Sequence, residues 1–264
     1  MSAQSTIYAQ KKQTLFLVLA GLFLTNAIVA EIIGTKIFSV EDTLGSGVAT
    51  FLMPLGSIFG YNLAAGALPW PLVFVTSDII NEYFGRQGVR KISYLGAFFI
   101  AYSFIIIFAA TKMSPAQFWI DVNKGDNNFN IDYAFSMIFR QGLGIIIGSI
   151  SAFLIAQLLD ATVFHRLRKM TGNKKIWLRA TGSTLVSQLI DSFVVLFVAF
   201  YIFGNWTIDQ VINIGINNYT YKCIIAILMT PVIYLAHNLI DRYLGKESAL
   251  QMTAEAVNDM PTTI

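Results

Sequence analysis

The sequence predicts an all-α membrane protein with six transmembrane helices and with the amino and carboxyl termini in the cytoplasm. Of its 264 residues, 55% are hydrophobic and only 12% are charged, and the mean hydropathy is +0.62, which is far more apolar than a soluble domain of this size. Apolar segments of about 20 residues, the length that crosses a bilayer as a helix, recur along the chain. Most of the 18 lysines and arginines fall in alternate loops, as is typical of cytoplasmic loops.

The apolar segments define the expected spans in chain order. The first follows a polar stretch and lacks a small-residue cleavage site, so we expect a retained span and not a signal peptide. The apolar region 48–84 contains several Pro and Gly residues and is too long for one straight span. We therefore expect a re-entrant or broken element there, followed by the second span. The predicted spans are 15–33, one crossing within 48–84, 92–110, 142–164, 177–203 and 223–239.

The charge distribution predicts the domain organisation. Residues 1–13 are expected to form a cytoplasmic tail, and 14–244 a single six-span transmembrane domain. Residues 245–264 are polar and are predicted to form a disordered cytoplasmic tail. Residues 112–133 are interpreted as a polar loop on the outer side.

Several classes of function lack their signatures in this sequence. Cys223 is the sole cysteine, so an internal disulfide is excluded. The chain has no phosphate-binding loop of an ATPase, no hydrolase nucleophile motif and no Cys/His metal spacing. We expect no cofactor, no bound metal, no nucleic-acid partner and no enzymatic activity.

Polar residues inside the apolar segments are the candidates for a functional site. Asp78 and Glu82 are four residues apart and share one helix face. Asp191 lies near the middle of its span, on the same face as Ser187, and Asp160 follows Gln157 on the preceding span. Ionisable groups are costly in a bilayer, so they indicate a polar pathway or a binding site.

Structural ion pairs are the alternative interpretation of these carboxylates. Glu82 also fits an interfacial residue near a basic loop. The candidate pairs are Asp160 with Arg166 or Arg168, and Glu31 with Lys36. We assign structural or gating roles to five residues: Glu31, Lys36, Arg179, Lys222 and His237.

Two local patterns concern packing and repetition. Gly144, Gly148 and Ala152 recur at four-residue spacing, which favours close approach of another helix. The heptapeptides IINEYFG (79–85) and LIDRYLG (239–245) match locally, but they are too short to establish an internal repeat.

Three stretches together resemble the queuosine precursor transporter family, also called the VUT family. They are PLVFVTSDIINEYFG (71–85), AQLLDATVFHRLRK (156–169) and WLRATGSTLVSQLIDSFVVLFVAF (177–200). The first span with Asn26 and Lys36, and YKCIIAILMTPVIYL (221–235), are similar as well. The resemblance implies a six-span protein of the bacterial inner membrane that imports the 7-deazaguanine bases preQ0 and preQ1 for tRNA modification.

The chemistry of such a base fits the polar residues within the spans. A 7-deazaguanine presents N1–H and a 2-amino group to a carboxylate, and its 6-oxo group accepts from an amide. Asp78, Asp160 and Asp191 are candidates for the carboxylate. The full predicted set of substrate-binding residues is Asn26, Asp78, Glu82, Gln157, Asp160, Ser187, Gln188 and Asp191.

Two other functions remain open from the sequence. One is the substrate-binding subunit of a vitamin uptake complex, which depends on a separate ATPase. The other is an intramembrane metal-dependent enzyme that uses Asp78 and Glu82 as ligands. Besides the purine-like substrate and the lipid bilayer, a second copy of the chain is a possible partner.

Overall fold

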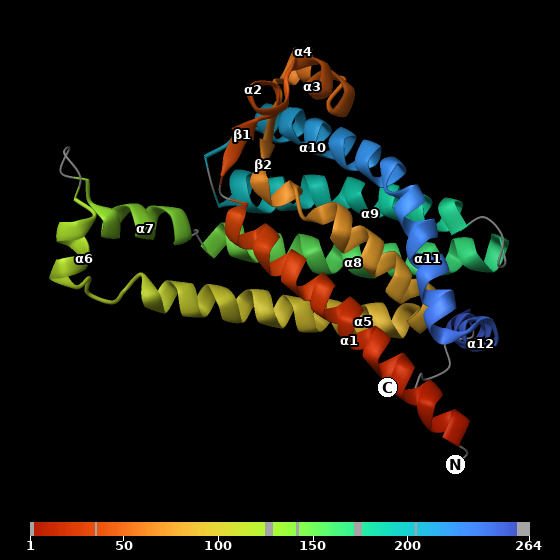
Figure 1. Cartoon of the computed structure of the whole chain (residues 1–264). Helices are drawn as coiled ribbons and strands as arrows, with labels where there is room; N and C mark the ends of the chain where they lie inside the picture. Colours follow the sequence, from red (N-terminus) through yellow and green to blue (C-terminus); the bar gives the residue numbers. More distant parts are fainter. Residues whose placement is uncertain are drawn as a thin grey trace.

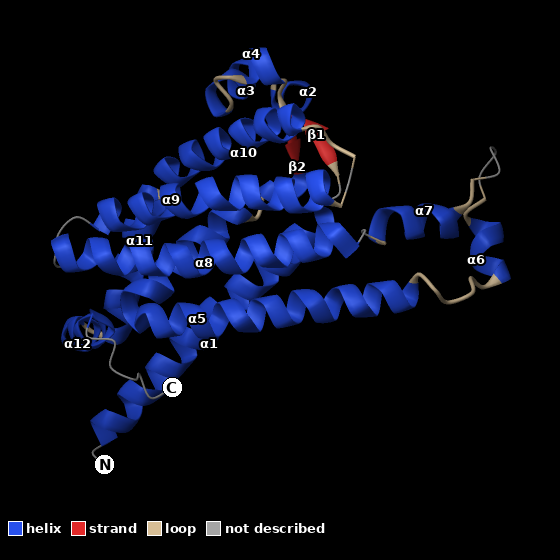
Figure 2. Cartoon of the chain, turned by 180° about the vertical axis from the view of Figure 1, so that it is seen from behind, coloured by secondary structure: helices blue, strands red, loops and turns tan. Residues whose placement is uncertain are grey.

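The computed structural model describes residues 3–34, 36–124, 129–140, 143–171, 176–203 and 205–257. It is an all-α membrane protein with one small hairpin, in which β1 (Ile37–Ser39) pairs antiparallel with β2 (Asn62–Ala64) (Figures 1 and 2). The long helices are α1 (Ala3–Ile33), α5 (Trp70–Ala110), α8 (Leu143–Thr171), α9 (Ile176–Leu196), α10 (Ile208–Leu228) and α11 (Thr230–Leu244). The shorter elements are α2 (Val40–Leu44), α3 (Ser46–Leu52), α4 (Gly56–Phe59), the 3₁₀ helix η1 (Ala65–Ala67), α6 (Gln117–Val122), α7 (Ile131–Phe139), the π-helix η2 (Phe197–Ile202) and α12 (Lys246–Val257).

Four helical segments of the described chain are long and apolar enough to cross a membrane: Thr6–Ile33, Ala65–Ala110, Ile145–Thr171 and Ile176–Ile202. A fifth is added if α10 and α11, which are bent by 43° relative to each other, form one span. The predicted second and third spans both fall within the single segment that contains α5, which is why the two counts differ.

Helix α5 is sharply bent at Gly85. This residue has φ 67° and ψ −173°, a backbone conformation that side chains other than glycine rarely adopt. A Cβ at Gly85 would also lie only 2.9 Å from the carbonyl oxygen of Ala256. The two halves of α5 consequently run in opposite directions, as the orange and yellow parts of the helix in Figure 1 show.

The expected broken element before the second span is a set of three short helices, α2 to α4, between the two strands. Positive-φ glycines end α2 and α4, at Gly45 and Gly60. These helices pack with α10 through a small apolar core that contains Ala49, Met53 and Tyr221. This cap lies at the top of Figure 1, beside α10.

The remaining boundaries differ from the sequence predictions where polar residues continue a helix. Helix α1 starts at Ala3, so the expected amino-terminal tail is helical from that residue on. Helix α10 starts at Ile208, 15 residues before the predicted sixth span, because its polar residues are accommodated against other parts of the protein. The predicted outer loop 112–133 contains the short helix α6 and the start of α7.

The predicted disorder of the carboxyl-terminal tail is wrong for residues 246–257, which form α12. Ala249, Met252 and Ala256 of this helix are buried, and the first two join the main apolar core, which also includes parts of α1, α5, α8 and α11. The alternation of apolar and polar residues at helical spacing explains why a segment of low average hydropathy still docks. The end of the predicted tail (258–264) and the first residue of the predicted fourth span, Gly142, lie outside the described residues.

Helices α8 and α9 form the most extensive helix pair of the bundle. The small-residue stripe of α8 allows a close helix contact at Gly148, as predicted. A Cβ added there would lie 2.9 Å from the backbone nitrogen of Ala199 in η2. Ala152, one turn further along, is buried with 1% of its surface exposed. Small side chains let the two backbones approach closely.

Candidate functional site

The first half of α5 is the central helix of the bundle. Every residue from Val73 to Gly85 is buried, which means that this helix is surrounded by protein on all sides. Asp78 and Glu82 are only 3% and 4% exposed and lie one turn apart, as their spacing predicts. A buried polar helix of this kind carries its carboxylates toward neighbouring helices and not toward lipid.

Asp78 and Asp160 form a buried acidic pair between α5 and α8. Their carboxylates lie close enough for the two charges to repel each other. Ser187 of α9 donates a hydrogen bond to Asp160 Oδ1 over 3.3 Å. On the α5 side, the hydroxyl of Ser77 donates to Gln157 Oε1 over 3.0 Å. Three helices thus contribute polar groups to one site, and four of its members were predicted from the sequence.

Several polar atoms on α5 and α9, the helices that carry Asp78 and Ser187, are buried without a hydrogen-bond partner in the described part of the chain. They are Asp78 Oδ1 and Asn81 Nδ2 on α5, and Gln188 Oε1 and Ser192 Oγ on α9. Each unsatisfied buried group costs roughly 1–3 kcal/mol, so folded proteins keep few of them. A polar ligand or ordered water that contacts these atoms would recover this free energy.

Glu82 belongs to a second group, which we call the arginine network: Glu82, Arg168 and Arg179. Arg179 donates two hydrogen bonds to the Glu82 carboxylate, from Nε over 2.9 Å and from Nη2 over 2.7 Å. Arg168 Nη2 lies 3.2 Å from Oε1 of the same carboxylate, and its Nη1 donates to the Glu82 backbone carbonyl. All three side chains are at most 5% exposed. In the described contacts Arg168 therefore pairs with Glu82, and not with Asp160 as one of the sequence-based alternatives had it.

Next to the arginine network, hydrogen bonds connect Tyr83, the residue after Glu82, with α11. Tyr83 donates to Asp241 Oδ1 over 2.7 Å, and His237 Nδ1 lies 3.0 Å from the Tyr83 hydroxyl oxygen. His237 thus makes a buried hydrogen bond in a structural position, as its place in the sequence predicts.

A third polar group surrounds the lysine pair, Asp191 with Lys222. Lys222 Nζ lies 2.5 Å from Asp191 Oδ2 and 5.5 Å from the centre of the Trp70 ring. Glu31 lies near both charges and accepts a hydrogen bond from Ser149. Asp191 and Lys222 are 5% and 7% exposed. Asp191 is thus paired with a cation, whereas the described ion pairs of lysine and arginine include neither Asp78 nor Asp160.

The arginine network, the acidic pair and the lysine pair follow one another along the bundle axis, and together we call them the polar column. Arg179, Ser183, Ser187 and Asp191 recur every four residues on one face of α9 and are all buried. At 1.5 Å per residue, the span from Arg179 to Asp191 is about 18 Å. The acidic pair therefore lies between the arginine network on one side and the lysine pair on the other.

Two of the predicted site residues lie elsewhere. Asn26 donates its amide hydrogen bond to Leu22 of its own helix over 2.8 Å. Lys36 is exposed, and its backbone carbonyl accepts from Ala65 at the hairpin. The described contacts do not connect either side chain to the acidic pair.

Some residues of this polar column were missed by sequence reasoning. Asn81 was seen only as a companion of Ser77, and Arg168 only as a loop cation that could pair with Asp160. Arg168 follows Asp160 by eight residues with Phe164 between them, so helical spacing was the signal that places it on the same face. Asp241 lies in the second of the two matching heptapeptides, whose glycines, Gly85 and Gly245, both have positive φ and both precede a new helical segment.

The arrangement suits binding of a polar solute more than metal chemistry. Within the described residues, no group of three or more His, Cys, Asp or Glu side chains is arranged to hold a metal ion. The acidic pair instead offers hydrogen-bond acceptors, with hydroxyl and amide groups around them.

Comparison with known proteins places this arrangement among membrane transporters. Three curated proteins are similar: the "Probable queuosine precursor transporter" of Bacillus subtilis is 28% identical over 69% of this chain and 75% of its own length. The protein of the same name from Haemophilus influenzae is 26% identical over 70% and 73%. The "Queuosine precursor transporter" of Escherichia coli is 26% identical over 74% and 81%. No solved structure matches the chain.

The sequence also matches a family model that extends from the end of β2 to the first half of α11. The matched residues are 64–236, and they include the acidic pair, the arginine network and the lysine pair. Since this match covers well over half of the chain, the protein belongs to the family described as "Putative vitamin uptake transporter".

Proposed function

We propose that this protein imports 7-deazaguanine precursors of queuosine, preQ0 and preQ1, across the bacterial inner membrane. The observation that carries the proposal is the acidic pair, two buried carboxylates without a neighbouring lysine or arginine in the described contacts, together with the unsatisfied polar atoms on α5 and α9. The names of the three similar proteins support the choice of substrate.

The polar atoms around the acidic pair match the edge of such a base. A carboxylate of Asp78 or Asp160 accepts from N1–H and the 2-amino group, in the manner of a bidentate pair. Asn81 Nδ2 is an unpaired donor for the 6-oxo group, and Gln188 Oε1 is an unpaired acceptor. A site built on such contacts rejects bases that lack the same groups, because its own buried atoms would stay unpaired. The second carboxylate suits the aminomethyl cation of preQ1.

The direction of transport rests on a proposed orientation with both termini in the cytoplasm. The bend at Gly85 makes two antiparallel crossings of α5, and α10 with α11 makes one, which together with α1, α8 and α9 gives six. The turn at Gly85, the end of α8, the start of α9 and the end of α11 then lie on one side, at the right of Figure 1. This side carries Arg86, Arg90, Lys91, Arg166, Lys169 and Arg242, as expected of a cytoplasmic face.

Uptake of labelled preQ1 by cells that cannot synthesise it tests the site. In Asp78→Asn and Asp160→Asn, the carboxylate becomes an amide that no longer accepts two charge-assisted hydrogen bonds. The loss of about 1.5–3 kcal/mol corresponds to a roughly ten- to hundredfold loss of affinity. We therefore expect strongly reduced uptake and weaker binding of both bases to the purified variants.

Asp209→Asn is the matched control, because Asp209 is exposed at the start of α10. This variant is expected to transport normally at an equal amount of membrane protein. Undiminished uptake by both acidic-pair variants would remove the proposed site.

A further inference from the structure

Helix α12 lies across the cytoplasmic end of the polar column, beyond the residues that the family match covers. It packs against the first half of α5 and the bend at Gly85, where its Ala256 backbone approaches the glycine. Figure 1 shows it beside the right-hand end of the bundle. The helix thus closes the bundle at the end where the proposed substrate would leave.

Few polar contacts hold α12 in this position. Arg168 Nη2 donates to the Thr253 carbonyl over 2.8 Å, so the arginine network is directly connected to α12. Lys12 Nζ lies 3.4 Å from Glu255 Oε2, and the Glu255 side chain is 32% exposed. Partly exposed ion pairs contribute at most about 1 kcal/mol. Two of the three buried side chains of α12 are alanines, which bury little apolar surface.

A pocket of about 310 Å³ lies between α12 and the polar column, at the lower end of the size range of small-molecule sites. Its wall on the bundle side is formed by Glu82, Tyr83, Ile176, Arg179, His237 and Asp241, and its wall on α12 by Lys246, Ala249, Leu250 and Thr253. Glu82 connects the pocket to the acidic pair, because Asp78 is one helical turn away. The rings of Tyr83 and His237 lie 5.2 Å apart, and they offer aromatic surface to a flat heterocycle.

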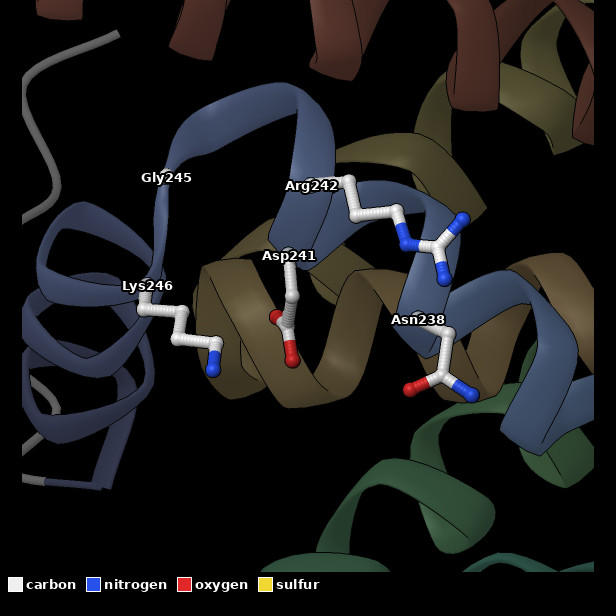
Figure 3. A pocket seen from close by; sticks show the side chains of 5 residues that line it. All are labelled: Asn238, Asp241, Arg242, Gly245 and Lys246. Atoms are coloured by element: carbon white, nitrogen blue, oxygen red, sulfur yellow. The ribbon is translucent and has the colours of Figure 1, made fainter.

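The turn between α11 and α12 has the properties of a hinge. Gly245 has φ 90°, and an added Cβ would meet no atom within 4 Å. Next to it is a second pocket, of about 460 Å³, lined by Asn238, Asp241, Arg242, Gly245 and Lys246. Figure 3 shows the side chains of Asp241 and Lys246 extending to the same side of this turn. The helix therefore has free space beside its attachment point and a residue that tolerates a wide range of backbone angles.

We propose that the pocket beneath α12 is a second binding position for the transported base, and that α12 is the lid that must lift before the base enters the cytoplasm. This inference rests on the proposed function and deepens it. In this scheme the base first binds at the acidic pair and is later released past α12, and different residues act in the two steps.

A reversible cross-link between α12 and α1 tests the lid. In a Cys223→Ser background, Lys12→Cys with Glu255→Cys is joined by a short thiol-reactive linker that contains a disulfide. With α12 locked, we expect loss of uptake, retained binding of preQ1 to the purified protein, and recovery of uptake on reduction. The matched control is Gln117→Cys with Asp121→Cys, which ties α6 to itself and should leave uptake unchanged.

A bulky substitution tests the pocket by itself. Thr253→Trp fills the pocket from α12, whereas Ala254→Trp places the same side chain on an exposed position of that helix. We expect Thr253→Trp to retain binding at the acidic pair and to lose most uptake, while Ala254→Trp keeps both.

Each contrary result has a distinct meaning. Unchanged uptake by the fully cross-linked protein overturns the lid, and unchanged uptake by Thr253→Trp overturns the second binding position. Loss of binding on cross-linking also overturns the proposal, because α12 would then act on the first step. If the wild-type protein neither binds nor imports the bases, the proposed function itself fails.

Discussion

At the scale of single residues, buried arginines explain why Glu82 is tolerated inside the bundle. Arg168 and Arg179 supply two guanidinium groups to one carboxylate, and Asp241 lies beyond Tyr83 in the same hydrogen-bond chain. Removing such charges from water costs desolvation free energy. Their mutual attraction offsets this cost when the geometry is good and all hydrogen bonds are made. Removing one member leaves the others buried without their partner.

Arg179→Gln is expected to destabilise the protein strongly, because breaking a buried pair costs about 3–5 kcal/mol. Thermal unfolding in detergent measures the effect as a lower midpoint temperature. The double variant with Glu82→Gln should unfold at a lower temperature than Arg179→Gln alone, since Arg168 then also loses its buried carboxylate partner. Arg166→Gln, at an exposed position of α8, is the control and should change the midpoint little. Equal midpoints for Arg179→Gln and Arg166→Gln would contradict the burial argument.

At the scale of secondary-structure elements, glycines and alanines decide how closely the helices approach. Gly148 of α8 faces the backbone of Ala199, and Ala152 and Ala156 continue the same buried stripe. This contact brings α8 and α9 together, and that approach places Asp160 within reach of Ser187. The packing of one stripe thus sets the geometry of the acidic pair.

Gly148→Val tests this dependence. Its added carbons would collide with the backbone of η2, and overpacking of this kind costs roughly 1–3 kcal/mol. We expect a lower unfolding temperature together with weaker binding of preQ1, because Asp160 is displaced from Ser187. Gly21→Val is the matched control, since a Cβ at Gly21 meets nothing within 4 Å on the exposed side of α1. A Gly148→Val protein as stable and as active as Gly21→Val would show that the close approach is dispensable.

At the scale of the whole molecule, the proposed orientation assigns the two ends of the bundle to opposite sides of the membrane. Met113, which is 70% exposed, follows α5 at one end, and the exposed Glu247 lies in α12 at the other. The two positions allow the membrane sidedness of the fold to be measured directly.

Cysteine labelling provides that measurement in the Cys223→Ser background. A membrane-impermeant maleimide should modify Met113→Cys in intact spheroplasts and Glu247→Cys only in inside-out vesicles. The positive-inside distribution of lysine and arginine is the physical reason for this expectation. Modification of both positions from the same side would refute an odd number of crossings between them and with it the six-span topology.

Much of the candidate site was predictable from the sequence, because its residues are unusual where they occur. Asp78, Asp160 and Asp191 stand out as carboxylates in apolar segments, and helical spacing connects Gln157 and Ser187 to them. The role of Lys222 as a structural partner was also expected, although Asp191 as its partner was not. Asn26 and Lys36 also stood out as polar residues in or beside an apolar segment, yet they lie outside the described contacts of the acidic pair. Polarity by itself does not say which way a helix face is turned.

By itself, the sequence determined the membrane class, the position of most helices and the set of polar residues inside them. These features follow from local hydropathy and from the 3.6-residue period of a helix. Only the tertiary structure decided which carboxylates are neutralised: Glu82 by two arginines and Asp191 by Lys222, whereas Asp78 and Asp160 have no such partner in the described contacts. The reason is that partners on different helices depend on the bend at Gly85 and on how closely α8 and α9 pack, and both are properties of the folded bundle.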